Sequence, residues 1–156
     1  MGVAGCGKTS IGLALAPLLA ARFLDGDDLH SPVNIAKMRR GEALTDADRA
    51  PWLAAVGQAL AAPGRLIVGC SALRRRYREL IRGAAGAPMR FVHLAGSRAV
   101  IAARLAARRG HFMPDSLLDS QFAALEPPEP DERVITVDID QPREAVVAAI
   151  LAGLAA

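Results

Sequence analysis

The first nine residues hold the pattern that most limits what this chain can fold into. They include Gly2-Val3-Ala4-Gly5-Cys6-Gly7-Lys8-Thr9, which matches G-x-x-x-x-G-K-[ST]. In this pattern a glycine-rich turn joins a strand to a helix, and its backbone N–H groups surround phosphate oxygens. A glycine-rich turn without a ligand is the alternative, but Lys8 is one of only two lysines in the chain. The pattern therefore predicts an α/β protein that binds a nucleotide.

The composition indicates one domain rich in helix. Of the 156 residues, 52% are hydrophobic and only 4% aromatic, so alanine, leucine, valine and isoleucine must build the core. The net charge of +3 comes from arginine, which suits small anionic ligands as well as nucleic acid. No apolar run approaches the roughly 20 residues of a membrane span. We expect a single domain over residues 1–156, located in the cytoplasm, with no membrane partner.

Apolar strand-like runs alternate with helical runs along the chain. This alternation predicts a parallel sheet with helices on both faces and right-handed crossovers. Thr45 and Asp48 have the spacing of a capping box at the start of a helix that ends at Ala61. We expect strands at 23–25, 65–70, 90–94 and 134–137, and helices at 9–21, 32–40, 46–61, 72–82, 98–109 and 143–156.

The start of the chain departs from the usual plan. A phosphate loop normally comes after a buried strand of about five residues, and here only Met1 precedes Gly2. We therefore expect the first strand to be truncated and Met1 to be an internal methionine of a longer chain. A version with an apolar N-terminal segment is expected to melt at a higher temperature and to bind ATP more tightly.

Several classes of nucleotide-binding protein are excluded by the residues after the loop. A GTPase needs Asn-Lys-x-Asp, but the single asparagine, Asn34, is followed by Ile35. A motor ATPase needs an apolar strand that ends in Asp-Glu, and the nearest candidate, 134–138, continues with Ile139. The remaining plan is that of a small-molecule kinase, with an acidic turn after an early strand and arginines late in the chain.

Several segments occur in a distinctive order and spacing along the chain: 23–30, 44–53, 70–73 with Tyr77-Arg78, 110–113, 120–122 and 125–128. Together they resemble the gluconokinases over essentially the whole chain. The resemblance implies a P-loop fold of the nucleoside-monophosphate-kinase type, phosphorylation of D-gluconate to 6-phosphogluconate with ATP and Mg²⁺, and a homodimer. A kinase for another small polyol or sugar acid, an inactive nucleotide-binding remnant and an arginine-driven nucleic-acid binder are the alternatives; we expect no nucleic-acid partner.

Each residue of the loop is expected to make a particular contact with ATP or Mg²⁺. Gly5 and Gly7 let the backbone approach the phosphates, Lys8 is expected to pair with the β and γ oxygens, and the Thr9 hydroxyl to bind Mg²⁺. Gly2, Cys6 and Ser10 complete the expected nucleotide contacts.

Two acids come directly after the strand expected at 23–25. By resemblance, Asp25 faces the water shell of Mg²⁺ and Asp27 faces the attacking hydroxyl, which makes Asp27 the candidate base. The alternative is an Asp-Gly turn selected only for its backbone.

Gluconate carries a carboxylate and five hydroxyls, so its site should contain arginine and neutral hydrogen-bonding groups. Arg49 is the candidate partner of the carboxylate. His30, Ser71 and Arg78 are candidate polyol contacts, although a surface or capping role is an equal alternative for His30. The run 74–78 is otherwise expected to be a solvated helix face, with Arg75 paired to Glu79.

A lid is expected at about 104–126. Arg104 and Arg108 would reach the phosphates of ATP when it closes, and we count Arg108 among the catalytic residues. The alternative is a basic helix end that complements its own dipole. Residues 138–142, including Gln141, fall where such kinases hold adenine.

Overall fold

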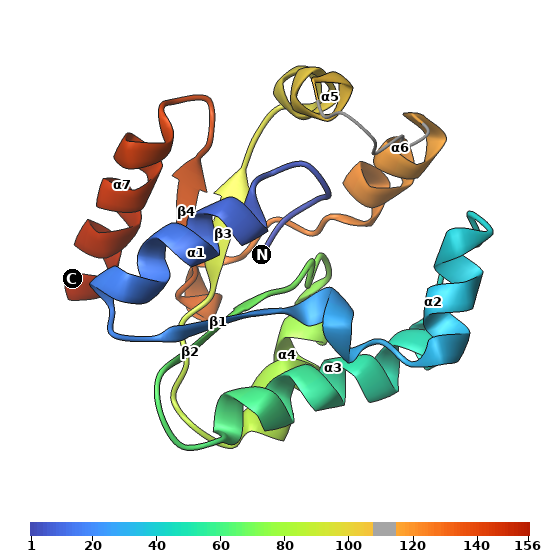
Figure 1. Ribbon diagram of the computed structural model, residues 1–156, viewed down its shortest axis with the longest axis horizontal. Helices are drawn as coiled ribbons and strands as arrows, with labels where there is room; N and C mark the ends of the chain where they lie inside the picture. The colour runs from blue at the N-terminus through green and yellow to red at the C-terminus, as the bar shows by residue number, and fades with distance from the viewer. Residues whose placement is uncertain (108–114) are drawn as a thin grey trace.

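The computed structural model describes residues 1–107 and 115–156 (Figure 1). None of the helices in this part of the chain is long and apolar enough to cross a membrane. The helices are α1 (Lys8–Leu18), α2 (Pro32–Arg39), α3 (Asp46–Ala61), α4 (Arg75–Ala85), α5 (Arg98–Ala106), α6 (Asp115–Ala124) and α7 (Arg143–Ala155). The strands are β1 (Arg22–Asp25), β2 (Leu66–Gly69), β3 (Val92–Ala95) and β4 (Ile135–Asp138), and short 3₁₀ turns are η1 (Gly26–Leu29) and η2 (Pro130–Glu132).

The strands form two parallel pairs. Strand β1 pairs with β2, and β3 pairs with β4. Between the pairs lies the start of the chain, where the Met1 carbonyl accepts a hydrogen bond from Leu94 N at 3.0 Å and Gly2 N donates to Ser71 O at 3.1 Å. The predicted parallel direction is confirmed. Within the described residues no strand pairs with both β2 and β3, so the two pairs are separate.

Helices cover both faces of the strands, as predicted. One apolar cluster joins α1, α5 and α7 through residues such as Leu15, Ile101 and Ile150. A second cluster joins α3 and α4 through Leu53 and Ile81. Because helices cover both faces, strand residues such as Ile67, Val68 and Val137 are apolar and pack into these clusters, as in other parallel sheets.

Local sequence signals place the start of α3 and shift the start of α4. The capping box at α3 is present, with Asp48 N donating to Thr45 Oγ1 at 3.2 Å and Thr45 N donating to Asp48 Oδ2 at 2.9 Å. Helix α4 begins three residues later than expected, at Arg75. The reason is an irregular turn after β2, in which Ala72 has a φ of +43°, a conformation incompatible with the interior of a helix.

The expected substrate contact of Arg78 is corrected by its burial. Its side chain is 0% exposed, and its Nη2 donates to Glu132 Oε1 at 2.7 Å. The carbonyls of Ala72, Leu73 and Glu126 accept hydrogen bonds from its Nη1. Hydrogen bonding to this guanidinium lowers the pKa of Glu132 to about 2. Arg78 therefore ties α4 to η2 inside the protein, and its charge is neutralised there.

A buried histidine makes the stability of this fold depend on pH. His93 on β3 is 6% exposed, and its Nδ1 has no hydrogen-bond partner within the described residues. Burial, helped by the positive charges of the Met1 ammonium and Arg78, lowers the pKa of His93 to about 4. Since the unfolded chain holds the proton more tightly, this contribution to stability is complete above pH 6.5 and is lost as the pH falls toward 4.

Between pH 7 and pH 4.5, we expect the titration of His93 to lower the free energy of unfolding by about 2 kcal/mol. The variant His93→Phe removes the titrating group and should show a correspondingly shallower pH dependence. Urea unfolding of both proteins at the two pH values is the measurement, and parallel pH profiles would contradict the assignment.

Candidate active site

The loop that leads into α1 has the backbone that phosphate binding requires. Gly5 and Gly7 have φ values of +84° and +97°, a region that residues with a Cβ rarely adopt. A Cβ on Gly5 would also lie 2.9 Å from Leu105 Cγ. Helix α1 starts directly after Gly7, so its free N–H groups and its positive dipole end face the loop. The arrangement suits an anion.

Lys8 closes the loop on itself. Its Nζ donates to the carbonyls of Gly2 and Val3, each at 3.1 Å. The ammonium therefore lies over the loop, where it can exchange a carbonyl for a phosphate oxygen. Gln121 of α6 holds the loop from the other side, because its Oε1 accepts a hydrogen bond from Ala4 N at 2.7 Å.

Thr9 and Asp25 bring two oxygen ligands together beside Lys8. Thr9 Oγ1 donates to Asp25 Oδ2 at 3.0 Å, which joins the start of α1 to the end of β1. Hydroxyl and carboxylate oxygens suit Mg²⁺, which commonly takes one or two protein ligands and completes its shell with phosphates and water. Among the described residues, no cluster of three or more His, Cys, Asp or Glu side chains forms a complete metal site. The two oxygens therefore fit a magnesium ion that arrives with a nucleotide.

The turn η1 carries the second acid. Asp25 Oδ1 accepts a hydrogen bond from Asp27 N at 3.1 Å, so the first acid orients the second. Asp27 is exposed as a residue, yet its carboxyl is partly shielded from water, and this desolvation raises its pKa. The negative charge of Asp25 acts in the same direction, and Lys8 opposes it. A raised pKa makes Asp27 a better proton acceptor when ionised.

Trp52 holds this turn in place. Its Nε1 donates to Gly26 O at 2.7 Å, and its ring stacks on His30 with centroids 4.2 Å apart and planes 14° apart. His30 is buried, and its desolvation lowers its pKa. Sequence reasoning missed Trp52 as a positioning residue, although it is the chain's single tryptophan and lies in a segment that carries the resemblance.

Arg49 lies on the same side of the molecule as this turn. Its guanidinium carbon is 5.8 Å from the centroid of the Tyr77 ring, and its Nη1 donates to Leu44 O. Its charge is close enough to His30 to contribute to the lowered pKa of that imidazole. Ser71 is half-buried after β2, where its carbonyl binds the Gly2 amide. The structure thus groups Asp27, His30 and Arg49, and places Ser71 beside the loop.

The opposite side of the loop contains a small cavity of about 180 Å³. Arg104 of α5 lies at this cavity and donates to Ile139 O, so it links α5 to the segment after β4. Cys6 is fully buried, and its side chain belongs to the apolar cluster that joins α1, α5 and α7. Arg108 lies outside the described residues, as does part of the expected lid. The predicted residues that line the cavity are Cys6, Gly7, Ser10, Arg104 and Gln141.

A phosphate loop ahead of a helix, with an acidic turn beside its lysine, defines a P-loop kinase of small molecules. A family model described as an AAA domain matches residues 1–128. The gluconokinase of Gluconobacter oxydans is 47% identical over 94% of this chain and 84% of its own length, and the thermoresistant gluconokinase of Escherichia coli is 46% identical over 97% and 89%. A gluconokinase structure from Sinorhizobium meliloti has 48% identity and a TM-score of 0.89, covering 99% of this chain and 89% of that one. The chain belongs to the gluconokinase family.

The position of Trp52 can be tested with Trp52→Phe, which keeps an aromatic ring against His30 and removes the indole N–H. The buried Gly26 carbonyl would lose its donor at a cost of about 1–2 kcal/mol. The substitution should loosen the turn that carries Asp27. We therefore expect kcat to fall several-fold and the affinity for ATP to change less.

Steady-state kinetics and ATP titration provide the measurement. Phe91→Leu in the same apolar cluster is the control, since it reduces packing without touching the turn. Equal effects of the two variants on kcat would show that Trp52 acts only through packing.

Proposed function

We propose that this protein transfers the γ-phosphoryl group of ATP to D-gluconate and produces 6-phospho-D-gluconate. The observation that carries the proposal is the identity of 46–47% to curated gluconokinases over nearly the whole chain. The grouping of Lys8, Thr9 and Asp25 beside Asp27, His30 and Arg49 supports it, because it supplies a phosphate side and an acceptor side to one site.

On the phosphate side, the chain provides neutralising charge and fixed donors. The loop amides and the start of α1 would hold the β and γ oxygens, and Lys8 would move from the Gly2 and Val3 carbonyls onto them. Thr9 and Asp25 would hold Mg²⁺, directly or through water. When bound, Mg²⁺ would supply positive charge that offsets the negative charge developing on the phosphates in the transition state.

On the acceptor side, Asp27 would accept the proton of the attacking hydroxyl. The hydroxyl oxygen then forms a bond to the γ-phosphorus while the bond from that phosphorus to the β,γ-bridging oxygen breaks. The proton remains on the Asp27 carboxyl until water removes it. The raised pKa of this carboxyl, caused by desolvation and by Asp25, matches the role.

Arg49 would bind the carboxylate of gluconate, because a guanidinium offers paired donors that match two carboxylate oxygens. His30 and Ser71 would contact hydroxyl groups. We also propose that Arg104 and Arg108 belong to a lid over about 104–126, that Gln141 lies beside the adenine, and that the protein acts as a cytoplasmic homodimer formed from one domain per chain.

The proton acceptor is tested by Asp27→Asn, which keeps the shape of the side chain and removes its basicity. We expect kcat to fall by roughly 10²- to 10⁴-fold, with ATP affinity changed less than about threefold. The matched control is Asp28→Asn, which alters an exposed acid in the same turn. A stronger effect on ATP binding than on kcat would instead favour a purely structural Asp-Gly turn.

The carboxylate partner is tested by Arg49→Ala in an ATP-consumption assay with a panel of sugars and sugar acids. We expect KM for gluconate to rise roughly 10- to 100-fold, because this is the affinity usually lost when a charged hydrogen bond is removed. KM for ATP should be unchanged. Arg40→Ala is the control, since Arg40 pairs with Glu42 at the surface. Preference for a neutral polyol in the unaltered protein would favour a different acceptor, and ATP binding without turnover would favour a nucleotide-binding remnant.

A further inference from the structure

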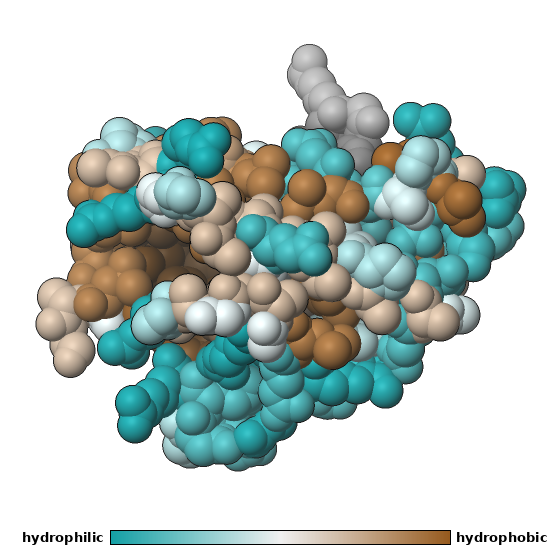
Figure 2. Space-filling view, turned by 90° about the horizontal axis from the view of Figure 1, so that it is seen from below, coloured by the Kyte–Doolittle hydropathy of each residue, from teal (hydrophilic) through white to brown (hydrophobic). Residues whose placement is uncertain are grey.

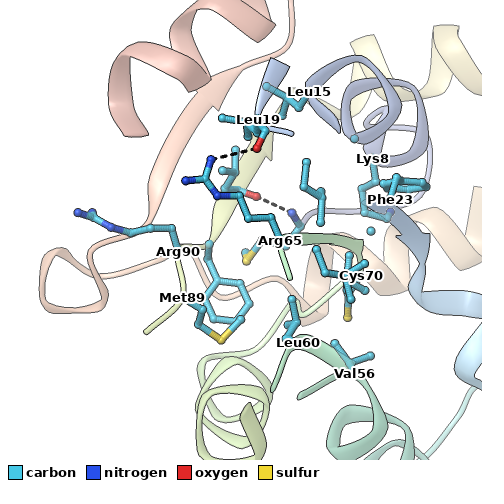
Figure 3. Close-up of a pocket in the computed structure, with 18 of the residues that line it drawn as sticks. Lys8, Leu15, Leu19, Phe23, Val56, Leu60, Arg65, Cys70, Met89 and Arg90 are labelled. Carbon is cyan, nitrogen blue, oxygen red and sulfur yellow. Dashed lines mark hydrogen bonds between the residues drawn. The ribbon is translucent and has the colours of Figure 1, made fainter. Parts of the chain in front are cut away.

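A cavity of about 400 Å³ separates the two strand pairs, and its walls are mainly apolar (Figure 3). Leu15 and Leu19 of α1 lie along one side, and Val56 and Leu60 of α3 lie along the other. Seen from below, the molecule is hollowed between hydrophobic residues at this point (Figure 2). An acid with five hydroxyl groups would leave most of its polar groups without partners there. Recognition of a sugar acid must therefore come from the region around Arg49.

Tyr77 of α4 lies within a cluster of charged side chains that includes Arg49. Tyr77 is buried, and the guanidinium carbons of Arg49, Arg74 and Arg76 lie 5.8, 5.8 and 5.4 Å from the centroid of its ring. The Tyr77 hydroxyl donates a hydrogen bond to Asp46 Oδ1. Within the described residues, Asp46 is the one acid that forms ion pairs with these arginines. Three positive side chains therefore surround the ring and share one negative side chain.

Asp46 lies where it could neutralise Arg49, but it is held elsewhere. The two residues are three apart on α3, a spacing at which acidic and basic side chains commonly pair. In the structure, one carboxylate oxygen of Asp46 accepts from the Tyr77 hydroxyl and the other accepts from Arg76 Nη2. None of the ion pairs in the described part of the chain includes Arg49, whose Nη1 donates to Leu44 O. Helix α4 thus binds the acid that the helix spacing offers to Arg49.

The charge of Asp46 makes this choice of partner important. The hydrogen bond from Tyr77 is the main cause that lowers the pKa of Asp46, and the two nearby arginines of α4 act in the same direction. Asp46 is therefore ionised at neutral pH. An Arg49 paired with it would have to give up that ion pair before binding a substrate carboxylate, so its affinity for an acid would fall. Asp48 does not compete in this way, because Lys37 Nζ lies 2.8 Å from its carboxylate.

We propose that Tyr77 sets the preference of this protein for an acidic acceptor over a neutral polyol. Its hydroxyl holds Asp46 on α4, and its ring attracts the Arg49 guanidinium, so Arg49 keeps its positive charge for the carboxylate of the substrate. Tyr77 is thus a positioning residue that acts through Asp46 and Arg49. This inference rests on the proposed role of Arg49 in binding gluconate.

The test is Tyr77→Phe, which keeps the ring and its packing but removes the hydroxyl that holds Asp46. We expect KM for gluconate to rise roughly three- to tenfold, because Asp46 can then pair with Arg49. Both kcat and KM for ATP should change less than about twofold, since only binding of the acceptor is affected. For D-glucitol, a neutral polyol of the same chain length, kcat/KM should fall less than for gluconate.

Asp46→Asn supplies a readout that a merely structural role would not move. In the double variant with Tyr77→Phe, KM for gluconate should return to within about twofold of the original value, because an amide cannot neutralise Arg49. If Tyr77 acted only through packing between α3 and α4, loss of the Asp46 charge would leave KM high. Ile81→Val is the matched packing control, since Ile81 is buried in the same apolar cluster of α4 and carries no polar group.

Arg76→Ala tests the same step at an exposed position, where the substitution leaves the core intact. It releases the other oxygen of Asp46, so KM for gluconate should again rise. Arg75→Ala is its control, because it removes the same charge from α4 but releases Glu79 and Asp131 instead. We expect Arg75→Ala to raise KM for gluconate less than Arg76→Ala does.

A mutant cycle without substrate separates this inference from the proposed function. Urea unfolding is measured for Asp46→Asn, for Arg49→Ala and for both together, with and without Tyr77→Phe. In the unaltered background the two effects on the free energy of unfolding should add. In the Tyr77→Phe background the double substitution should cost less than the sum of the single ones, because each single substitution already breaks the new ion pair.

Three results would each overturn the inference: an unchanged KM for gluconate in Tyr77→Phe, no rescue by Asp46→Asn, or additive unfolding effects in the Tyr77→Phe background. If the unaltered protein consumes no ATP with gluconate, the proposed function fails. The unfolding cycle then still decides whether Tyr77 keeps Asp46 away from Arg49.

Discussion

The position of the loop from Gly2 to Lys8 is the constraint on which the rest of the site depends. At its end the loop is continuous with α1, and at its start it is held by backbone hydrogen bonds from Met1 to β3 and from Gly2 to Ser71. Its shape requires glycine where φ is positive. This backbone sets the positions of Lys8 and Thr9. Any displacement of the loop therefore moves the ammonium group and the hydroxyl that would face the phosphates. Precise placement matters because phosphoryl transfer depends on positioning and electrostatics rather than on covalent help from the protein.

The acceptor side is positioned by a different part of the fold. The turn with Asp25 and Asp27 leaves β1, but its distance from the helical layer is set by Trp52 of α3 through the Gly26 carbonyl. Asp25 connects the two sides, since it accepts hydrogen bonds from the Thr9 hydroxyl and from the Asp27 amide. One carboxylate thus fixes the position of the phosphate side relative to the acceptor side. Transfer between two substrates requires both to be held at a fixed distance and orientation.

Much of the fold was predictable because its signals are local. The alternation of strands and helices, the capping box of α3 and the i,i+4 pair of Arg75 with Glu79 all depend on residues close in sequence. The start of α4 was misplaced because the turn at Ala72 has no glycine or proline to mark it. Arg78 was assigned to the substrate because, within its run of arginines, nothing in the sequence reveals that Glu132, 54 residues away, neutralises it inside the protein. Gln121 and Trp52 act through backbone groups distant in sequence, which spacing alone cannot indicate.

By itself the sequence determined the phosphate loop, its lysine and hydroxyl, the α/β class and the family resemblance. Each of these depends on residues that are close together in the sequence. Tertiary structure decided which arginines face the site and which are buried, how the acidic turn is held, and that the strands form two separate pairs. These features depend on groups far apart along the chain that meet only when the helices pack. Burial and partner choice are properties of that packing, and they set the charge that each side chain carries.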